Sequence, residues 1–144
     1  MGTRSTITFY EKWNDTEKPI LCIYQQYDGY IDCVGKDLAR WLKRRKLING
    51  IQNETDTAGY ANGIGCLLAQ FVRDHKTEIG DLYISPIDTN KEFIDYNYKV
   101  IINDGVGDVD DLTTIIVTNW DNEESIFEGK PSELLLYEPK DEDE

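Results

Sequence analysis

Two glycine-rich stretches of this sequence carry residue types and spacings that suit the binding of an anion. Residues 29–42 and 59–72 align at an offset of 30 positions, and five of the fourteen aligned pairs are identical. Each stretch has a Gly-Tyr turn, a short side chain, a further glycine and an apolar helical pattern. A helix N-terminus offers unpaired amides and the positive end of the helix dipole, and glycine lets a ligand approach the backbone. Each stretch could therefore hold an anion such as a phosphate.

If the two stretches pack as a pseudo-symmetric pair, we expect them to face one cleft. The tyrosines would stack on a ring of the ligand, a lysine would neutralise its charge, and an arginine on a neighbouring strand would add a fork of donors. In the alternative, the glycines only allow close packing and the tyrosines fill the core, since neither stretch has the spacing of a P-loop or a dinucleotide fingerprint. The residues predicted to bind the ligand are Arg4, Gln26, Tyr30, Asp32, Gly35, Lys36, Tyr60, Asn62, Gly63 and Gly65.

The sequence offers no recognisable set of catalytic or metal-binding residues. The single histidine, His75, falls near the end of an apolar helical stripe, where packing or capping is the commoner role. No Gly-x-Ser-x-Gly motif occurs, and the three cysteines show no C-x-x-C spacing, which is typical of a reducing compartment. The aspartate-rich residues 104–111 lack EF-hand spacing. We expect no catalytic residue, metal or cofactor, and a cytoplasmic location, in the host cell if the protein is viral.

The elements that must position these residues follow the pattern of an α+β protein. Residues 3–10 and 20–27 predict two antiparallel strands joined by a turn at 14–19, and an N-cap at Asp32 begins the first helix. Apolar residues from Ile64 to His75 recur with a helical period. Further strands are expected at residues 82–87, 96–103, 113–120 and 125–127, and a helical turn at 131–136. The prediction is an antiparallel sheet of about five or six strands with two pseudo-repeated helices on one face, in a single domain (1–138) with an acidic C-terminal tail (139–144).

The charge of the chain is divided unevenly between its two parts. Residues 1–86 hold eleven Lys/Arg and eleven Asp/Glu, whereas residues 87–144 hold four and seventeen, which is the whole net charge of −13. An acidic half repels nucleic acid and suits either a basic partner or plain solubility. The longest apolar runs are shorter than a bilayer span, so no membrane association is expected.

Three motifs together resemble a known group of proteins. They are Met1-Gly2-Thr3-Arg4-Ser5, then Tyr24-Gln25-Gln26-Tyr27-Asp28-Gly29-Tyr30 with its downstream Gly35, and Gly59-Tyr60-Ala61-Asn62-Gly63-Ile64-Gly65. The chain is similar in these motifs to small uncharacterised proteins of phages, large viruses and bacteria. The resemblance covers most of residues 1–75 and implies a viral or mobile-element origin, with no role for any single residue.

The sequence therefore supports two functional hypotheses. The first is a non-catalytic binding protein of viral or mobile-element type that holds a small anionic ligand, for instance a nucleotide, at the paired helix N-termini. The alternative is an acidic interaction module, or a nucleic-acid mimic, that blocks a basic surface of a host protein. An enzyme is the less favoured third hypothesis, because no catalytic constellation is recognisable.

Overall fold

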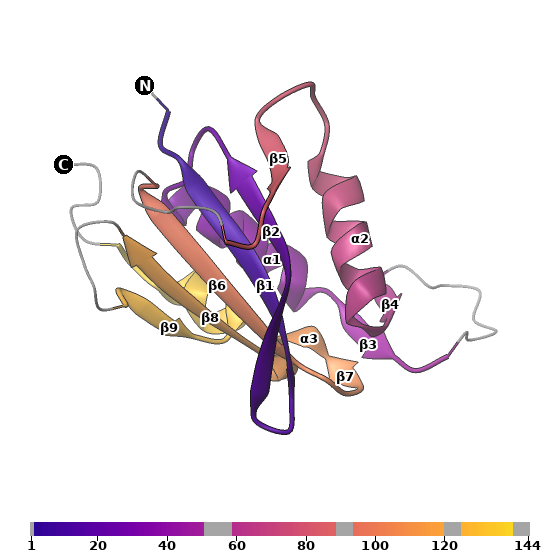
Figure 1. The fold of residues 1–144 in the computed structure, drawn as a ribbon. Coiled ribbons are helices and arrows are strands. Elements are labelled where there is room, and N and C mark those ends of the chain that lie inside the picture. Colours follow the sequence, from indigo (N-terminus) through magenta and orange to yellow (C-terminus); the bar gives the residue numbers. More distant parts are fainter. Residues whose placement is uncertain (1, 51–58, 89–93, 120–124, 140–144) are drawn as a thin grey trace.

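A six-stranded sheet forms the centre of the molecule. The computed structural model describes residues 2–50, 59–88, 94–119 and 125–139 (Figure 1). The strands of the main sheet lie in the order β5-β2-β1-β6-β8-β9. The predicted α+β fold is confirmed, because the helices lie against a sheet that is mostly antiparallel. The strands of this sheet are β1 (Ser5–Trp13), β2 (Thr16–Gln25), β5 (Leu82–Ser85), β6 (Tyr96–Asn103), β8 (Thr113–Asn119) and β9 (Phe127–Gly129).

The first two strands form a hairpin with a two-residue turn. Asn14 and Asp15 both have positive φ angles, of 48° and 63°. A type I′ hairpin turn needs this conformation at both central residues, and Asn and Asp adopt it more readily than most. The prediction of a turn extending to Pro19 was therefore wrong. Strand β2 begins at Thr16, because the Asn-Asp pair alone reverses the chain.

The main sheet is antiparallel except at its centre. β1 pairs with β2 antiparallel but with β6 parallel, in a register that runs from Ser5 opposite Tyr96 to Lys12 opposite Asn103. The pairs β2–β5, β6–β8 and β8–β9 are antiparallel. The sequence prediction missed the parallel pair, because strand order is set by long-range packing and not by local pattern.

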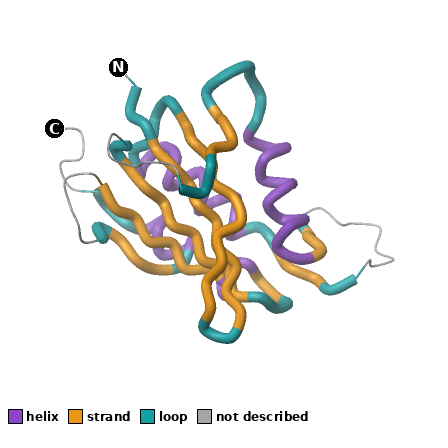
Figure 2. The backbone as a smooth tube through the Cα atoms, in the orientation of Figure 1, coloured by secondary structure: helices purple, strands orange, loops and turns teal. Residues whose placement is uncertain are grey.

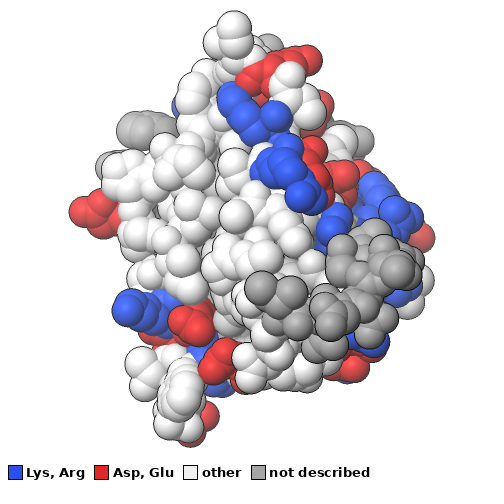
Figure 3. Space-filling view, turned by 90° about the vertical axis from the view of Figure 1, so that its right-hand side faces the viewer, with Lys and Arg blue, Asp and Glu red and all other residues white. Residues whose placement is uncertain are grey.

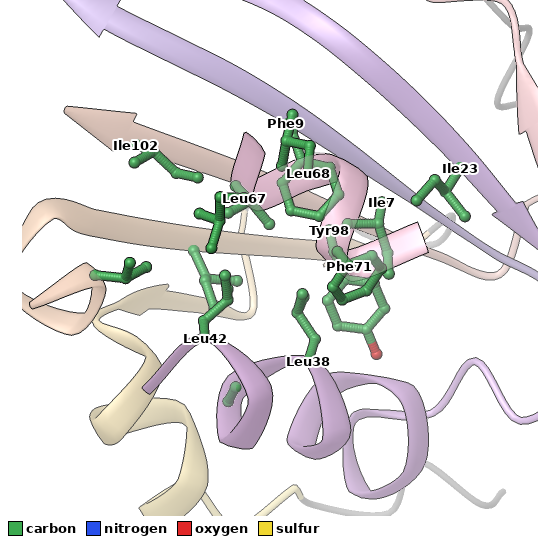
Figure 4. Packing of buried hydrophobic residues seen from close by; sticks show 14 of the residues in the cluster. Ile7, Phe9, Ile23, Leu38, Leu42, Leu67, Leu68, Phe71, Tyr98 and Ile102 are labelled. Atoms are coloured by element: carbon green, nitrogen blue, oxygen red, sulfur yellow. The ribbon is translucent and has the colours of Figure 1, made fainter. Parts of the chain in front are cut away.

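Helices cover one face of the main sheet and form the core with it. They are α1 (Lys36–Lys43), α2 (Gly63–His75) and α4 (Pro131–Leu136), and Figure 2 shows them beside the strands. Alternate residues of a strand share one face, so Ile7 and Phe9 of β1 point into the same layer as Tyr98 of β6. Figure 4 shows Leu38 and Leu42 of α1 meeting this layer, and Phe71 of α2 lies edge-on to Phe9 at 5.3 Å. Full burial of side chains of this size stabilises the fold by about 1.5–3 kcal/mol each.

A second, three-stranded sheet was not foreseen. It has the order β4-β3-β7, from Tyr60–Asn62, Lys46–Ile48 and Gly107–Asp108, and a short helix, α3 (Val109–Leu112), follows it. Strands of two or three residues are too short for an alternating pattern to appear. The predicted acidic tail lies outside the described residues apart from Pro139.

Three smaller predictions need correction. A single π-helical turn, η1 (Ile31–Gly35), leads into α1, and Tyr30 takes the cap position without a side-chain hydrogen bond. Asp32 lies inside this turn and faces Lys36 at 3.6 Å, so it is not the helix cap. β5 ends at Ser85 rather than residue 87, and the edge strand β9 runs from Phe127 to Gly129.

Candidate functional site

The two glycine-rich stretches do not face a common cleft. The start of α1 lies against the end of α2, where His75 Nε2 is 2.9 Å from Asp37 Oδ2. Trp41 of α1 packs edge-on against Phe71 and His75. α2 is 13 residues long, so its N-terminus lies about 18 Å from this contact at a helical rise of 1.5 Å per residue. The expectation of one shared cleft is therefore wrong, because the two helix starts point to different parts of the molecule.

The backbone amides of the first stretch are already used by the chain itself. Cys33 N and Gly35 N both donate to the carbonyl oxygen of Tyr30, at 3.0 and 3.3 Å, and Val34 N donates to Asp28 O at 3.1 Å. Gly35 is buried, and a Cβ placed on it would lie 3.1 Å from the ring of Tyr98. For this stretch the geometry fits the packing alternative, in which glycine admits a close neighbour.

The second stretch lies open on the surface. A Cβ on Gly65 would meet nothing within 4 Å, and Gly63 has a φ of 88° at the turn between β4 and α2. Asn62 does not cap α2, because its side-chain oxygen accepts a hydrogen bond from Gly50 N at 2.9 Å. The carbonyl oxygen of Tyr60 accepts from Gln70 Nε2 at 3.0 Å.

Four further residues predicted to bind the ligand are tied to neighbouring groups. Lys36 Nζ donates to the carbonyl oxygens of Leu135 and Tyr137, at 3.2 and 2.7 Å, where α4 ends. Arg4 N donates to Asp95 Oδ2 at 2.8 Å. Gln26 Oε1 accepts from the hydroxyl of Tyr24, and the half-buried Tyr30 packs near Tyr96 with ring centroids 6.0 Å apart. The binding roles of the ten residues stay predictions, and the structure does not bring the ten together.

The N-terminal motif and the Asp-Gly-Tyr motif pack against each other. Gly29 N donates to Thr3 O at 2.9 Å, and a Cβ on Gly29 would lie 2.8 Å from the Cβ of Ser5. The buried hydroxyl of Tyr98 donates to Gly29 O at 2.6 Å. A Cβ on Gly2 would likewise meet the ring of Tyr27 at 2.7 Å. These contacts fix the position of the segment just after β2, which contains the exposed residues Tyr27 and Asp28.

A cleft of about 340 Å³ opens beside this fixed segment. It lies between the end of β2, the π-helical turn η1, the start of α1, the end of α2 and the residue before β5. Its apolar wall includes Leu38 and Phe71. Its volume falls within the range of small-molecule sites, and π-helical turns are frequent at functional sites. The charged groups that line it are Asp28, Asp32, Asp37, Asp81, Arg40 and His75.

His75 contacts acceptors of the chain through both ring nitrogens in the wall of this cleft. Its Nδ1 is 2.8 Å from Phe71 O and its Nε2 is 2.9 Å from Asp37 Oδ2. Both partners are acceptors, so both ring nitrogens donate when the ring is protonated. Burial alone would lower the pKa of His75, but the hydrogen bonds to Asp37 and Phe71 O outweigh it and raise the pKa. The hydrogen bond from His75 in turn lowers the pKa of Asp37. Both ring nitrogens of His75 therefore have a partner in the chain itself.

Two aspartates of the cleft have side chains without a described partner. Asp28 and Asp81 have positive φ angles of 59° and 70°, and their carbonyl oxygens accept from Val34 N and Gln26 N. Within the described ranges, no hydrogen bond or ion pair engages their carboxylates. The four aspartates outnumber Arg40 and His75, so the cleft has an excess of negative charge.

Aspartates of the acidic half, residues 87–144, contact neighbouring groups of the fold. Asp110 accepts from both the backbone N and the hydroxyl of Ser132, at 2.7 and 2.8 Å, at the start of α4. Asp108 and Asp111 face Lys46 and Lys130. In the part of the chain that the structure describes, no cluster of three or more His, Cys, Asp or Glu is placed to hold a metal ion. Nor does any described helix have the length and apolar character to cross a membrane.

The charge on the side of the molecule that carries α2 is mixed. Figure 3 shows Lys and Arg side chains there next to Asp and Glu side chains, with large uncharged areas between. Asp74 of α2 is an example. Hydrogen bonds from Arg73 and then from Trp41 lower its pKa to about 2. The negative net charge of the chain therefore does not form one continuous acidic surface on this side.

Of the ten residues predicted from sequence, Asp32 lines the cleft. The other residues that line the cleft come from the end of β2, from α1 and α2, and from the turn before β5. The end of β2 and the turn before β5 lie close together because β2 pairs with β5. The one feature of the sequence that pointed to this cleft was the dense run of polar and aromatic residues at 24–30. Comparison with known proteins finds no family model, curated protein or solved structure that matches this chain.

Proposed function

We propose that this is a non-catalytic binding protein whose ligand places a positively charged group in the cleft beside η1. The proposal shares a basic partner with the second hypothesis from the sequence, but its carboxylates belong to residues 1–86 and not to the acidic half. The observation that carries it is the pair of cleft carboxylates, Asp28 and Asp81, with no partner within the described chain. A carboxylate binds an ammonium or guanidinium group through charge-assisted hydrogen bonds.

Tyr27 supports the same ligand class. Its side chain is 55% exposed and lines the cleft next to Asp28. The face of an aromatic ring attracts a cation, and the attraction adds to that of nearby carboxylates. A cleft that combines an exposed ring with carboxylates suits the end of an arginine or lysine side chain, or a free amine with the same group.

An anionic ligand has less support in this geometry. The amides of Cys33, Val34 and Gly35 donate to carbonyl oxygens of the chain, and Lys36 donates to the end of α4. An anion at α1 would have to displace these bonds. Acid–base catalysis has little support either, because both ring nitrogens of His75 contact acceptors of the chain itself.

The test is calorimetric titration with three probes. Agmatine supplies a free guanidinium and ammonium group, a short arginine-containing peptide supplies the same chemistry as part of a protein, and AMP supplies a nucleotide anion. We expect the two cationic probes to bind and AMP not to bind. If the peptide binds much more tightly than agmatine, the natural source of the cation is a protein.

The double variant Asp28→Asn/Asp81→Asn should weaken binding of the cationic probes by at least about tenfold, since a hydrogen bond to a charged group contributes about 1.5–3 kcal/mol. Asp15→Asn is the matched control. Asp15 also has a positive φ, of 63°, but it lies at the tip of the β1–β2 hairpin and does not line the cleft. Tight binding of AMP without binding of agmatine would refute the proposal, as would unchanged affinity in the double variant.

A further inference from the structure

One outer edge of the six-stranded sheet is formed by β5, which pairs with β2 alone (Figure 1). The hydrogen bond from Gln26 N to Asp81 O, at 2.9 Å, shows which groups of β5 point toward β2. Hydrogen-bonded and non-hydrogen-bonded pairs alternate along an antiparallel ladder, so Leu82 and Ile84 direct their N–H and C=O groups outward. Outward groups of this kind are a template on which another strand can pair.

Most of the outward groups of β5 are closed by the chain itself. Leu82 N donates to Gly80 O at 2.8 Å, and Leu82 O accepts from Lys76 Nζ at 2.9 Å. Pro86, just beyond the end of the strand, has no N–H to offer. Ile84 lies between them, and within the described ranges no hydrogen bond engages its outward N–H and C=O groups.

The side chain of Lys76 reaches this edge from the end of α2. Its Nζ donates to Gly80 O as well as to Leu82 O, both at 2.9 Å, and lies 5.5 Å from the centre of the Tyr83 ring. A strand that paired along β5 would need the position beside Leu82 O that the ammonium group occupies. It would also have to remove a charge from water, and lysine is one of the residues with which proteins protect the edges of sheets.

The side chains around this edge are unusually apolar for a surface. Among the described residues nine large hydrophobic side chains are exposed, and four of these lie within residues 79–87: Ile79, Tyr83, Ile84 and Ile87. Exposed apolar side chains beside open backbone groups favour association with another strand. In a solution of the pure protein, that strand is β5 of a second copy.

A two-fold pair centred on Ile84 is self-complementary. Ile84 N of each copy donates to Ile84 O of the other, and the two β-branched side chains lie opposite each other. Leu82 of one copy then lies opposite Pro86 of the other. Because Leu82 N already donates to Gly80 O and Pro86 has no N–H, neither residue brings an unpaired N–H into the pair. A symmetric dimer requires a surface that matches itself in this way.

We propose that Lys76 is a strap that closes the outer edge of β5 and keeps it from pairing with β5 of a second copy. This inference is independent of the ligand of the cleft. β5 has four residues, so the pair would bury less than the about 1,200–2,000 Å² of a stable interface. Its stability would depend on few contacts, and one lysine is therefore sufficient to prevent it.

Sedimentation equilibrium over a wide range of concentration tests the strap in Lys76→Met, which keeps most of the length of the side chain and removes its donors. We expect the wild-type protein to be monomeric and the variant to form dimers, with self-association at least about tenfold tighter, because the wild-type protein must break hydrogen bonds from a charged group in order to pair. The substitution makes the net charge of −13 more negative, so reduced repulsion between copies does not explain a gain.

Lys99→Met is the matched control. Lys99 also lies over a tyrosine ring, that of Tyr10 at 4.8 Å, but it belongs to the inner strand β6. This variant loses the same charge and should remain monomeric.

A second substitution tests whether the dimer forms through the strand edge. Ile84→Pro removes the outward N–H but no bond to β2, and proline is tolerated on an edge strand where its nitrogen faces solvent. The double variant Lys76→Met/Ile84→Pro should therefore be monomeric again. Amide hydrogen exchange reports on the same group, since the Ile84 amide should exchange fast in the wild-type protein and become protected in concentrated Lys76→Met.

A monomeric Lys76→Met would overturn the inference, as would wild-type dimers that are equally tight. Dimers that persist in the double variant would also overturn it, because the association would then come from the apolar side chains and not from the backbone of the edge. Should Lys76→Met not fold, hydrogen exchange of the wild-type protein still decides. Fast exchange at Ile84 in a monomer supports an open group at this edge, whereas slow exchange there would refute it.

Discussion

The two glycine-rich stretches have similar sequences but lie in different surroundings. In the first, Gly35 is buried against the ring of Tyr98, which comes from β6. In the second, Gly65 occupies the matching position near the start of α2, is exposed, and would have empty space around a Cβ. Glycine at the same position of the repeat thus allows close packing at Gly35 and has no close neighbour at Gly65. The difference comes from a partner more than sixty positions away along the chain.

The first glycines of the two stretches differ in a second way. Gly29 has little space, since a Cβ on it would lie 2.8 Å from Ser5 Cβ and 2.9 Å from Thr3 O. Gly59 has a φ of 86°, in the left-handed region, and its carbonyl oxygen accepts from Lys46 N at 2.9 Å. The first position therefore needs glycine for its small size, and the second needs it mainly for its backbone conformation, although a Cβ there would also lie 3.0 Å from Arg44 O.

Gly29→Ala should give the largest loss of stability among these substitutions. The obstructing atoms include backbone of the N-terminal segment, which cannot move without breaking the Gly29–Thr3 hydrogen bond, so we expect a loss of about 3 kcal/mol, at the upper end of overpacking costs. Urea unfolding measures it. The added methyl group would also push the segment that carries Tyr27 and Asp28 away from the cleft.

Gly59 provides the matched comparison. Gly59→Ala should cost about 1–2 kcal/mol from left-handed strain, and Gly59→Asn should cost less, because Asn tolerates this conformation. At Gly29 the order should be reversed, with Asn worse than Ala, because space is limiting there. An equal loss for Ala and Asn at both positions would contradict the distinction between size and conformation.

Gly35→Ala and Gly65→Ala should change stability in opposite directions. At Gly35 the new methyl group would press on the Tyr98 ring, which cannot retreat without loosening its hydrogen bond to Gly29 O, so we expect a loss of about 1–2 kcal/mol. At Gly65 the residue is helical and exposed, so alanine should stabilise by about 0.5–1 kcal/mol through a lower entropy of the unfolded chain. Thermal unfolding of the two variants side by side checks both signs, and a loss at Gly65 would show that this glycine has a structural neighbour.

Local pattern was sufficient for much of the fold. The helical period from Ile64 to His75 became α2, and the strands expected at 96–103 and 113–120 became the antiparallel pair β6 and β8. In the first helix, Leu38 and Leu42 are buried as the apolar stripe indicated. These features depend on neighbours in sequence, because the amphipathic period of a helix and the residues of a turn can be recognised within a few positions.

The candidate site depends on contacts between residues far apart in the sequence, which a local sequence pattern does not predict. Asp28 and Asp81 come together because β5 pairs with β2, and His75 meets Asp37 because α1 crosses the end of α2. Just after α1, Arg45 lies over the ring of Trp41 at 4.1 Å and pairs with Asp74 of α2. The pseudo-repeat predicted two equivalent sites. The two stretches differ in the structure because each one packs against different residues.

The contact between Asp37 of the first stretch and His75 at the end of α2 should give the smallest effect, and it should depend on pH. The pKa of His75 is raised above its ordinary value of 6.5, so its stabilising contribution is fully present below about pH 6.5 and is lost as pH rises through the folded pKa. The pKa of Asp37 is lowered from 3.8, so its contribution is present above about pH 4 and is lost as pH falls through the folded pKa. The pair should therefore stabilise the protein most between about pH 4 and 6.5, by at most about 1 kcal/mol, because water screens the 60% exposed Asp37.

Urea unfolding of the wild-type protein, His75→Gln, Asp37→Asn and the double variant at pH 5.5 and 8.5 tests this link. The wild-type protein should lose its advantage over each single variant at the higher pH, and the double variant should be no less stable than the additive sum of the two singles, since one interaction is removed only once. A wild-type advantage that is equal at both pH values would mean that His75 holds α1 against α2 through its stacking on Phe71 rather than through its charge. In that case the first stretch would be fixed to the second by packing alone, as Gly35 is fixed to Tyr98.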